Sequence, residues 1–180
     1  MKLMVTRRMT PAAEHALSAR FDTTIMDRTD GLTEAEAAAA MAEYDAVMPT
    51  LGDRFSAGAF GGDLRCRLLA NFGAGFNHID IAAAANAGIA VTNTPDAVTE
   101  ATADIALTLI LMTARRAGEG ERVLRRGEWT GWQPTQLLGR HVSGATVGII
   151  GMGRIGKAIA RRCHFGFGMD VLFHNRSTVS

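Results

Sequence analysis

The sequence has 180 residues, of which 47% are hydrophobic, so it is long enough to bury a core as one domain or as two small ones. Its 19 basic and 18 acidic side chains nearly cancel, which leaves no overall field to attract nucleic acid or an anionic membrane surface. The longest apolar run, 105–114, is too short to cross a bilayer, and Arg7 and Arg8 interrupt the start where a signal peptide would be apolar. Two distant cysteines without a CxxC partner predict reduced thiols. We therefore expect a cytoplasmic protein with no nucleic-acid, membrane or metal partner.

The first hundred residues alternate short apolar runs with alanine-rich stretches, as βαβ units of a parallel sheet do. Thr33 and Glu36 have the spacing of a capping box, and Asn77 is placed to cap a later helix. The pattern predicts an α/β fold with strands at 3–6, 24–26, 46–49, 66–71 and 89–93, and helices at 12–20, 34–43 and 79–87.

After Thr94 and Pro95 the pattern changes, and 98–126 is predicted to form one long helix. The stretch 127–144 holds both tryptophans and little periodicity, which indicates an extended arm. A strand at 145–151, a helix at 154–163 and a strand at 170–175 are predicted to follow. We therefore expect two domains, 1–97 and 98–180.

A GxGxxG motif, built on Gly151, Gly153 and Gly156, lies directly between the predicted strand 145–151 and the helix that follows. The first glycine permits a tight turn, the second lets the backbone approach a pyrophosphate, and the third lets helix and strand pack closely. The helix N-terminus would then bind phosphates through its free amides. A glycine-rich turn without a ligand is the alternative, which the flanking strands and helix disfavour.

The residues at and after the end of the predicted strand 170–175 indicate which nucleotide the site would bind. An NAD site places an acidic residue about twenty residues after the last glycine, to bind the ribose hydroxyls. Here the chain has Asn175, Arg176 and Ser177 and no acid. Because arginine pairs with phosphate and serine can donate to it, this end favours NADP over NAD. In the alternative, Arg176 is a solvated surface charge and the site accepts NAD through Asn175.

The segment 71–80 contains Gly73 and Gly75 and runs from a strand end into a helix cap. Free backbone amides are expected to gather there, where they would suit a small carboxylate. A tight turn that needs small residues is an equally good explanation on physical grounds. We expect His78 to lie at the surface beside the cap and not to act as a catalytic acid.

With these motifs, the chain resembles the D-isomer-specific 2-hydroxyacid dehydrogenases, and within them the glyoxylate and hydroxypyruvate reductases. The resemblance rests on four segments in the family's order, 71–80, 91–104, 127–139 and 146–156. It implies a flavodoxin-like parallel-sheet substrate domain followed by the first part of a Rossmann NAD(P)-binding domain. The implied activity is reduction of a small 2-oxo acid to the D-2-hydroxy acid.

The resemblance also implies roles for residues that match the family's motifs. The substrate site would comprise Leu51, Gly73, Ala74 and Gly75. The coenzyme site would comprise Thr102, facing the nicotinamide, Gly151, Gly153, Arg154, Ile155 and Gly156 beside the pyrophosphate, and Asn175, Arg176 and Ser177 beside the adenosine ribose. Residues 98–144 would form a homodimer interface, although Trp129 and Trp132 could instead anchor the arm to its own domain.

In this family the catalytic Arg, Glu and His follow the second coenzyme strand, so the resemblance places no catalytic residue within these 180 residues. It thus implies a C-terminally truncated chain that is inactive alone. A non-enzymatic protein that senses nucleotides or binds partners on the same scaffold, as corepressors do, is the alternative function.

Overall fold

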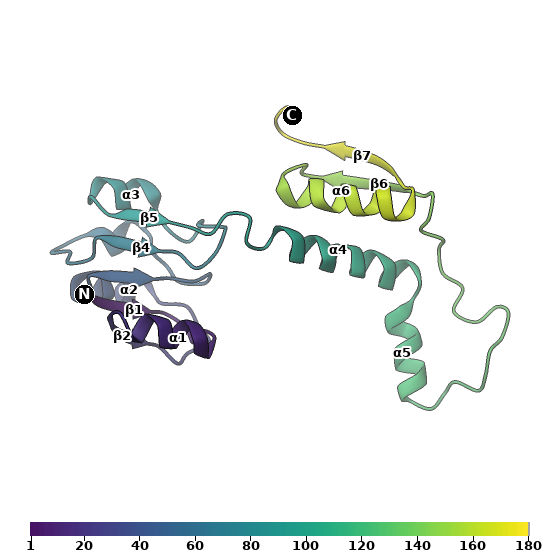
Figure 1. Cartoon of the computed structure of the whole chain (residues 1–180), viewed down its shortest axis with the longest axis horizontal. Coiled ribbons are helices and arrows are strands. Elements are labelled where there is room, and N and C mark those ends of the chain that lie inside the picture. The colour runs from purple at the N-terminus through teal and green to yellow at the C-terminus, as the bar shows by residue number, and fades with distance from the viewer. Residues whose placement is uncertain (180) are drawn as a thin grey trace. The chain divides into compact units, whose positions relative to one another are not determined.

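The computed structural model describes residues 1–179 and divides into two compact units, Met1–Pro95 and Asp96–Ser180 (Figure 1). The first unit contains a parallel sheet of five strands in the order β2-β1-β3-β4-β5. The second contains a parallel pair, β6 and β7, and three helices. The predicted α/β class and the flavodoxin-like order of the first sheet are confirmed.

The first unit follows the predicted alternation of strands and helices. Its elements are β1 (Lys2–Val5), α1 (Pro11–Ser18), β2 (Asp22–Ile25), α2 (Glu34–Glu43), β3 (Ala46–Met48), the 3-10 helix η1 (Ala57–Phe60), β4 (Leu68–Ala70), α3 (Ile81–Asn86) and β5 (Ala90–Thr92). Strands β3, β4 and β5 are shorter than predicted because the apolar runs continue beyond the residues that pair, whereas β1 has the predicted length and β2 is one residue longer.

Successive residues of β1 enter two different cores, as the two-residue period of a strand requires. Met4 lies in the larger core with α2, η1 and α3, and Leu3 and Val5 lie in the smaller one, against Leu17 of α1. The larger core is closed by the fully buried side chains Leu32, Met41, Val47, Phe55 and Leu69. Helices therefore cover both faces of the first sheet.

Two helix starts show how local chemistry sets the element boundaries. The capping box at α2 is present, with the Glu36 amide donating to Thr33 Oγ1 and the Thr33 amide donating to the Glu36 carboxylate. The prediction that Asn77 caps α3 is wrong. The cap is Asp80, whose Oδ1 accepts from the Ala83 amide at 3.0 Å. The helix starts this late because the Asp80 amide donates to the Phe55 carbonyl and the Phe55 amide donates to the His78 carbonyl.

The second unit contains α4 (Thr99–Ala114), α5 (Ala117–Arg125), β6 (Thr146–Ile150), α6 (Arg154–Phe167) and β7 (Asp170–His174). Strands β6 and β7 pair in parallel from Thr146 opposite Asp170 to Ile150 opposite His174. A small core of Val142, Cys163 and Met169 joins α6 to apolar side chains of α4.

The prediction of one continuous helix over 98–126 is wrong. The chain breaks between α4 and α5 at Arg116, which adopts a left-handed φ of 56°. The returning arm explains the break, because Arg140 N donates to the Ala114 carbonyl at 2.8 Å and the Arg116 guanidinium donates to the Leu138 carbonyl. Residues 127–144 contain no helix or strand. No helix among residues 1–179 is both long and apolar enough to span a membrane.

Candidate functional site

The carbonyls of the glycine loop 73–75, which follows β4, accept hydrogen bonds from other residues of the first unit. Asn71 Nδ2 donates to the carbonyls of Gly73 at 3.1 Å and Gly75 at 2.9 Å. Asn93 Nδ2 donates to the Ala74 carbonyl at 2.8 Å, and the Thr94 amide also donates to the Gly73 carbonyl. All three loop carbonyls therefore accept hydrogen bonds from the first unit.

The amides of the same loop have no such partners. Within residues 1–179, neither Ala74 N nor Gly75 N donates to a protein acceptor. Unpaired successive amides are donors that a small anion such as a carboxylate can use. Gly73, Ala74 and Gly75 therefore form one loop in which the amides of Ala74 and Gly75 are free to donate to a ligand.

Leu51 lies beside this loop at the same edge of the sheet. Thr50 and Phe72 form an isolated parallel bridge, and Phe72 N donates to the Pro49 carbonyl at 2.9 Å. Leu51 follows directly and is 69% exposed. An exposed apolar side chain next to the free amides is available to contact the body of a small ligand.

Asp53, which the sequence analysis missed, fixes the loop that carries Leu51. Its buried carboxylate accepts from Thr6 Oγ1 at 2.6 Å and from the amides of Leu32 and Thr50, both at 2.8 Å. Arg7 completes the set with an ion pair at 3.2 Å. A carboxylate with this many donors is a structural anchor, because it connects three segments of the unit.

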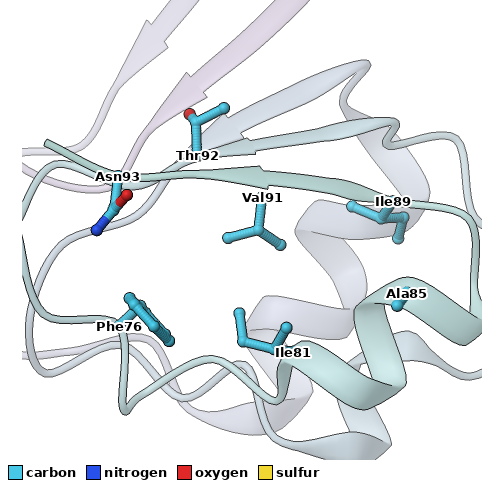
Figure 2. A pocket seen from close by; sticks show the side chains of 7 residues that line it. All are labelled: Phe76, Ile81, Ala85, Ile89, Val91, Thr92 and Asn93. Atoms are coloured by element: carbon cyan, nitrogen blue, oxygen red, sulfur yellow. The ribbon is translucent and has the colours of Figure 1, made fainter.

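An apolar pocket of about 310 Å³ lies between α3 and β5 (Figure 2). Phe76 and Ile81 face Val91 across it, and the side chain of Asn93 lies at its end near Phe76. Its other lining residues are Ala85, Ile89 and Thr92. The pocket offers no charged group, so it does not provide the chemistry that a carboxylate needs.

His78 differs from the expectation of a surface residue. Both of its ring nitrogens are buried and lack a hydrogen-bond partner among residues 1–179. Burial lowers the pKa of His78, and the nearby Asp53 carboxylate opposes this less strongly. The imidazole is therefore neutral at pH 7.

The glycine turn between β6 and α6 has the geometry that its sequence predicts. Gly151 has a φ of 94°, which favours glycine, and its amide donates to the His174 carbonyl at 2.8 Å. A Cβ on Gly156 would lie 2.2 Å from the Gly151 carbonyl oxygen, so only glycine fits there. A Cβ on Gly153 would meet nothing within 4 Å, which leaves the middle of the turn open to an approaching group.

Helix α6 begins immediately after Gly153, which makes no side-chain cap. Its first amides are therefore available to a phosphate. Arg154, the first helical residue, is exposed and carries a positive charge beside those amides, and Ile155 follows it, partly buried. The open turn, free amides and cation together fit a pyrophosphate group.

The strand end after β7 lies against the glycine turn. Gly151, Asn175, Arg176 and Ser177 line one pocket of about 400 Å³ with Ile150 and His174. Asn175 connects the glycine turn to the residues after β7. Its Oδ1 accepts from the Met152 amide at 3.0 Å, and its Nδ2 donates to the Ser177 carbonyl at 2.8 Å. Arg176 has no ion-pair partner within residues 1–179, so its guanidinium is available to an anion.

Thr102 lies in the first turn of α4, where its amide donates to the Val98 carbonyl at 2.9 Å. Its side chain is exposed and has no hydrogen bond to the glycine turn among the described residues. The structure therefore places it in the same unit as the turn, with no hydrogen bond between the two among the described residues.

Comparisons with known proteins agree with this geometry. Residues 107–180 match the family described as D-isomer specific 2-hydroxyacid dehydrogenase, NAD binding domain. A glyoxylate reductase from Thermococcus onnurineus is 37% identical over 180 residues, which is 98% of this chain and 54% of that protein. Another, from Thermococcus kodakarensis, is 46% identical over 139 residues, or 75% of this chain and 41% of that protein.

Solved structures show the same likeness. A D-isomer specific 2-hydroxyacid dehydrogenase from Polaromonas sp. JS6 66, described as putative, matches with a TM-score of 0.88 and 40% identity, over 99% of this chain and 56% of that one. The TT0316 protein from Thermus thermophilus matches with a TM-score of 0.89 and 38% identity, over 99% of this chain and 57% of that one. The chain thus spans about half the length of the relatives it matches. The chain is therefore similar to the D-isomer specific 2-hydroxyacid dehydrogenases over nearly its whole length, and its residues 107–180 match their NAD binding domain.

Proposed function

We propose that the protein reduces a small 2-oxo acid of the glyoxylate or hydroxypyruvate type to the D-2-hydroxy acid, with a nicotinamide coenzyme. The observation that carries the proposal is the loop at 73–75, whose carbonyls are tied back while the amides of Ala74 and Gly75 remain free. Relatives named glyoxylate reductase support the same substrate class. They lend no support to the alternative of a non-enzymatic nucleotide sensor or corepressor.

In this account the residues of the chain bind and orient the reactants. The two free amides receive the substrate carboxylate, and Leu51 contacts the rest of the molecule. The glycine turn, the first amides of α6 and Arg154 hold the pyrophosphate, and Thr102 faces the nicotinamide. The coenzyme, when bound, supplies the hydride. We assign no proton donor within residues 1–179, and so propose that the 180-residue chain alone binds its ligands without turnover.

The dependence of activity on the substrate carboxylate tests this proposal. With the protein expressed from its own gene, NADPH oxidation is measured with hydroxypyruvate and with hydroxyacetone, which has the same ketone and hydroxyl but no carboxylate. We expect kcat/KM for hydroxypyruvate to be higher by at least about a hundredfold, because the charge-assisted bonds to the loop amides are lost with hydroxyacetone. Equal values for the two compounds would contradict the proposed use of the loop.

We further propose that NADP is preferred to NAD, because Arg176 is unpaired beside the turn and no acid lies at the end of β7. Arg176→Gln is expected to weaken NADPH binding by about tenfold or more and to leave NADH binding within about twofold, since only NADPH carries the 2′-phosphate. Fluorescence titration of both coenzymes measures this. Arg20→Gln, in the first unit, is the control for loss of one positive charge. An equal loss for both coenzymes would contradict the assignment.

We propose a homodimer through residues 98–144. Trp132 is 80% exposed and Trp129 51% exposed on the arm, which is more aromatic surface than a loop anchored to its own domain would leave in water. Trp132→Glu is expected to convert the dimer to monomer at micromolar concentration in analytical ultracentrifugation, because it buries a charge in the interface. Trp132→Phe should remain dimeric. An unchanged dimer in the glutamate variant would exclude the tryptophan from the interface.

We infer a cytoplasmic setting from the two thiols. Cys66 and Cys163 are both free and buried, and burial raises the pKa of each thiol. Protonated, enclosed thiols resist oxidation, and neither cysteine forms a disulfide that would stabilise the fold in an oxidising compartment.

A further inference from the structure

Asp96 is the first residue of the second unit and has an unusual backbone conformation. Its φ is 69°, in the left-handed region that glycine adopts most easily. Aspartate tolerates this region better than most residues, but it still costs more there than glycine. Its carbonyl accepts from the Thr99 amide at 3.0 Å, which starts the turn into α4. A glycine would serve the turn equally well, so the carboxylate calls for its own explanation.

That carboxylate contacts the glycine turn of the coenzyme site. Asp96 Oδ1 and Arg154 Nε are 2.7 Å apart, and both side chains are about two thirds exposed. The two residues line a pocket of about 550 Å³ with Met152 and Lys157. In the same pocket, Glu100 pairs with Arg161 at 3.6 Å and with Arg162 at 2.8 Å. Asp96 is therefore the acid that engages Arg154.

The ion pair uses one side of the guanidinium only. Nε is the Arg154 nitrogen that the ion pair brings to 2.7 Å from Asp96 Oδ1, and the two terminal nitrogens of Arg154 donate no hydrogen bond within residues 1–179. Arginine presents its donors in a rigid planar fork, so fixing Nε also fixes the direction of the terminal nitrogens. A phosphate can bind the terminal nitrogens of Arg154 while Nε remains paired with the Asp96 carboxylate.

We propose that Asp96 is a positioning residue for the coenzyme, which holds Arg154 by Nε so that its terminal nitrogens are ready to receive the pyrophosphate. The inference rests on the proposed function, because it needs a dinucleotide at the glycine turn. Without Asp96 the arginine side chain samples many rotamers, and binding must then order it. This explains why a carboxylate lies where the backbone would favour glycine.

The test compares a ligand that carries a pyrophosphate with one that does not. The affinities of ADP and adenosine are measured by calorimetry on the protein expressed from its own gene and on Asp96→Gly, which removes the carboxylate and suits the backbone. We expect ADP to bind about three- to fivefold more weakly to the variant, because an exposed ion pair contributes little free energy. Adenosine should bind equally to both proteins. Asp96→Asn keeps an acceptor for Arg154 Nε, and its affinity for ADP should stay within about twofold of that of the original protein.

Two controls separate positioning from structural and charge effects. Glu121→Gln removes a negative charge from an exposed ion pair on α5, and is expected to leave both affinities unchanged. In an Arg154→Ala background, Asp96→Gly should have no further effect on ADP, because the group that it positions is gone.

Three outcomes would overturn the inference: ADP affinity that is unchanged or tighter in Asp96→Gly, an equal loss for adenosine, or an undiminished effect in the Arg154→Ala background. Tighter binding would mean that the carboxylate competes with the phosphate. If the original protein binds neither ADP nor NADPH, the proposed function fails and the inference fails with it. If the original protein binds ADP and Asp96→Gly binds it equally well, only the inference about Asp96 is overturned.

Discussion

Gly156→Ala is expected to destabilise the protein by about 2 kcal/mol and to weaken NADPH binding by at least about tenfold. The added Cβ would lie 2.2 Å from the Gly151 carbonyl oxygen and 3.2 Å from its carbon. Both atoms belong to the backbone, so relief requires α6 to move away from the turn. That movement also separates the amides of α6 from the phosphates they would bind. Urea denaturation measures the stability, and fluorescence titration measures the coenzyme affinity.

Gly166→Ala is the matched control, because it makes the same substitution in the same helix. A Cβ on Gly166 would meet nothing within 4 Å. The variant should therefore be more stable by about 0.5–1 kcal/mol, through the better helix propensity of alanine, with unchanged NADPH affinity. If Gly156→Ala behaved like Gly166→Ala, the close approach of helix and turn would not be a requirement of the site.

Asn71→Asp is expected to raise KM for the 2-oxo acid by at least about tenfold while KM for NADPH stays the same. The substitution hardly changes the shape of the side chain, but it replaces the amide donor with an oxygen. That oxygen would face the carbonyls of Gly73 and Gly75, which Asn71 Nδ2 now contacts at 3.1 and 2.9 Å. Repulsion between them should turn the loop, and the amides of Ala74 and Gly75 would lose their common direction.

Asn86→Asp controls for the same change at an exposed residue of α3 and should leave both KM values unaltered. Thermal unfolding of Asn71→Asp shows whether the first unit still folds, and its retained NADPH affinity would show that the coenzyme site is intact. An unaltered KM for the 2-oxo acid in a folded Asn71→Asp protein would contradict the assignment of the loop as the carboxylate site.

Local patterns were sufficient to predict much of the fold. Short apolar runs between alanine-rich stretches identified the strands, and the box at Thr33 and Glu36 placed the start of α2 because both partners lie within one helical turn. The glycine turn was equally predictable, since the positive φ of Gly151 and the close approach of Gly156 to the Gly151 carbonyl arise within six residues of sequence. These features depend on interactions between near neighbours in the chain, which a sequence displays directly.

The features that were missed depend on distant segments. The break at Arg116 is set by the returning arm some twenty residues later, and the true cap of α3 follows from pairing with the loop at Phe55. Asp53 brings together segments that are up to 47 positions apart. Asn71 and Asn93 hold the loop at 73–75 through hydrogen bonds to its carbonyls. An asparagine at the end of a strand hints at such a role, but only the fold shows which carbonyl it reaches.

The most direct test of the central claim follows the hydride itself. The protein expressed from its own gene is incubated with hydroxypyruvate and NADPH that carries deuterium at the transferable position of the nicotinamide, and the product is examined by mass spectrometry and chiral chromatography. We expect D-glycerate with one deuterium on C2, the former ketone carbon. Recovery of unreacted hydroxypyruvate from a protein that binds NADPH, or formation of the L-product, would contradict it.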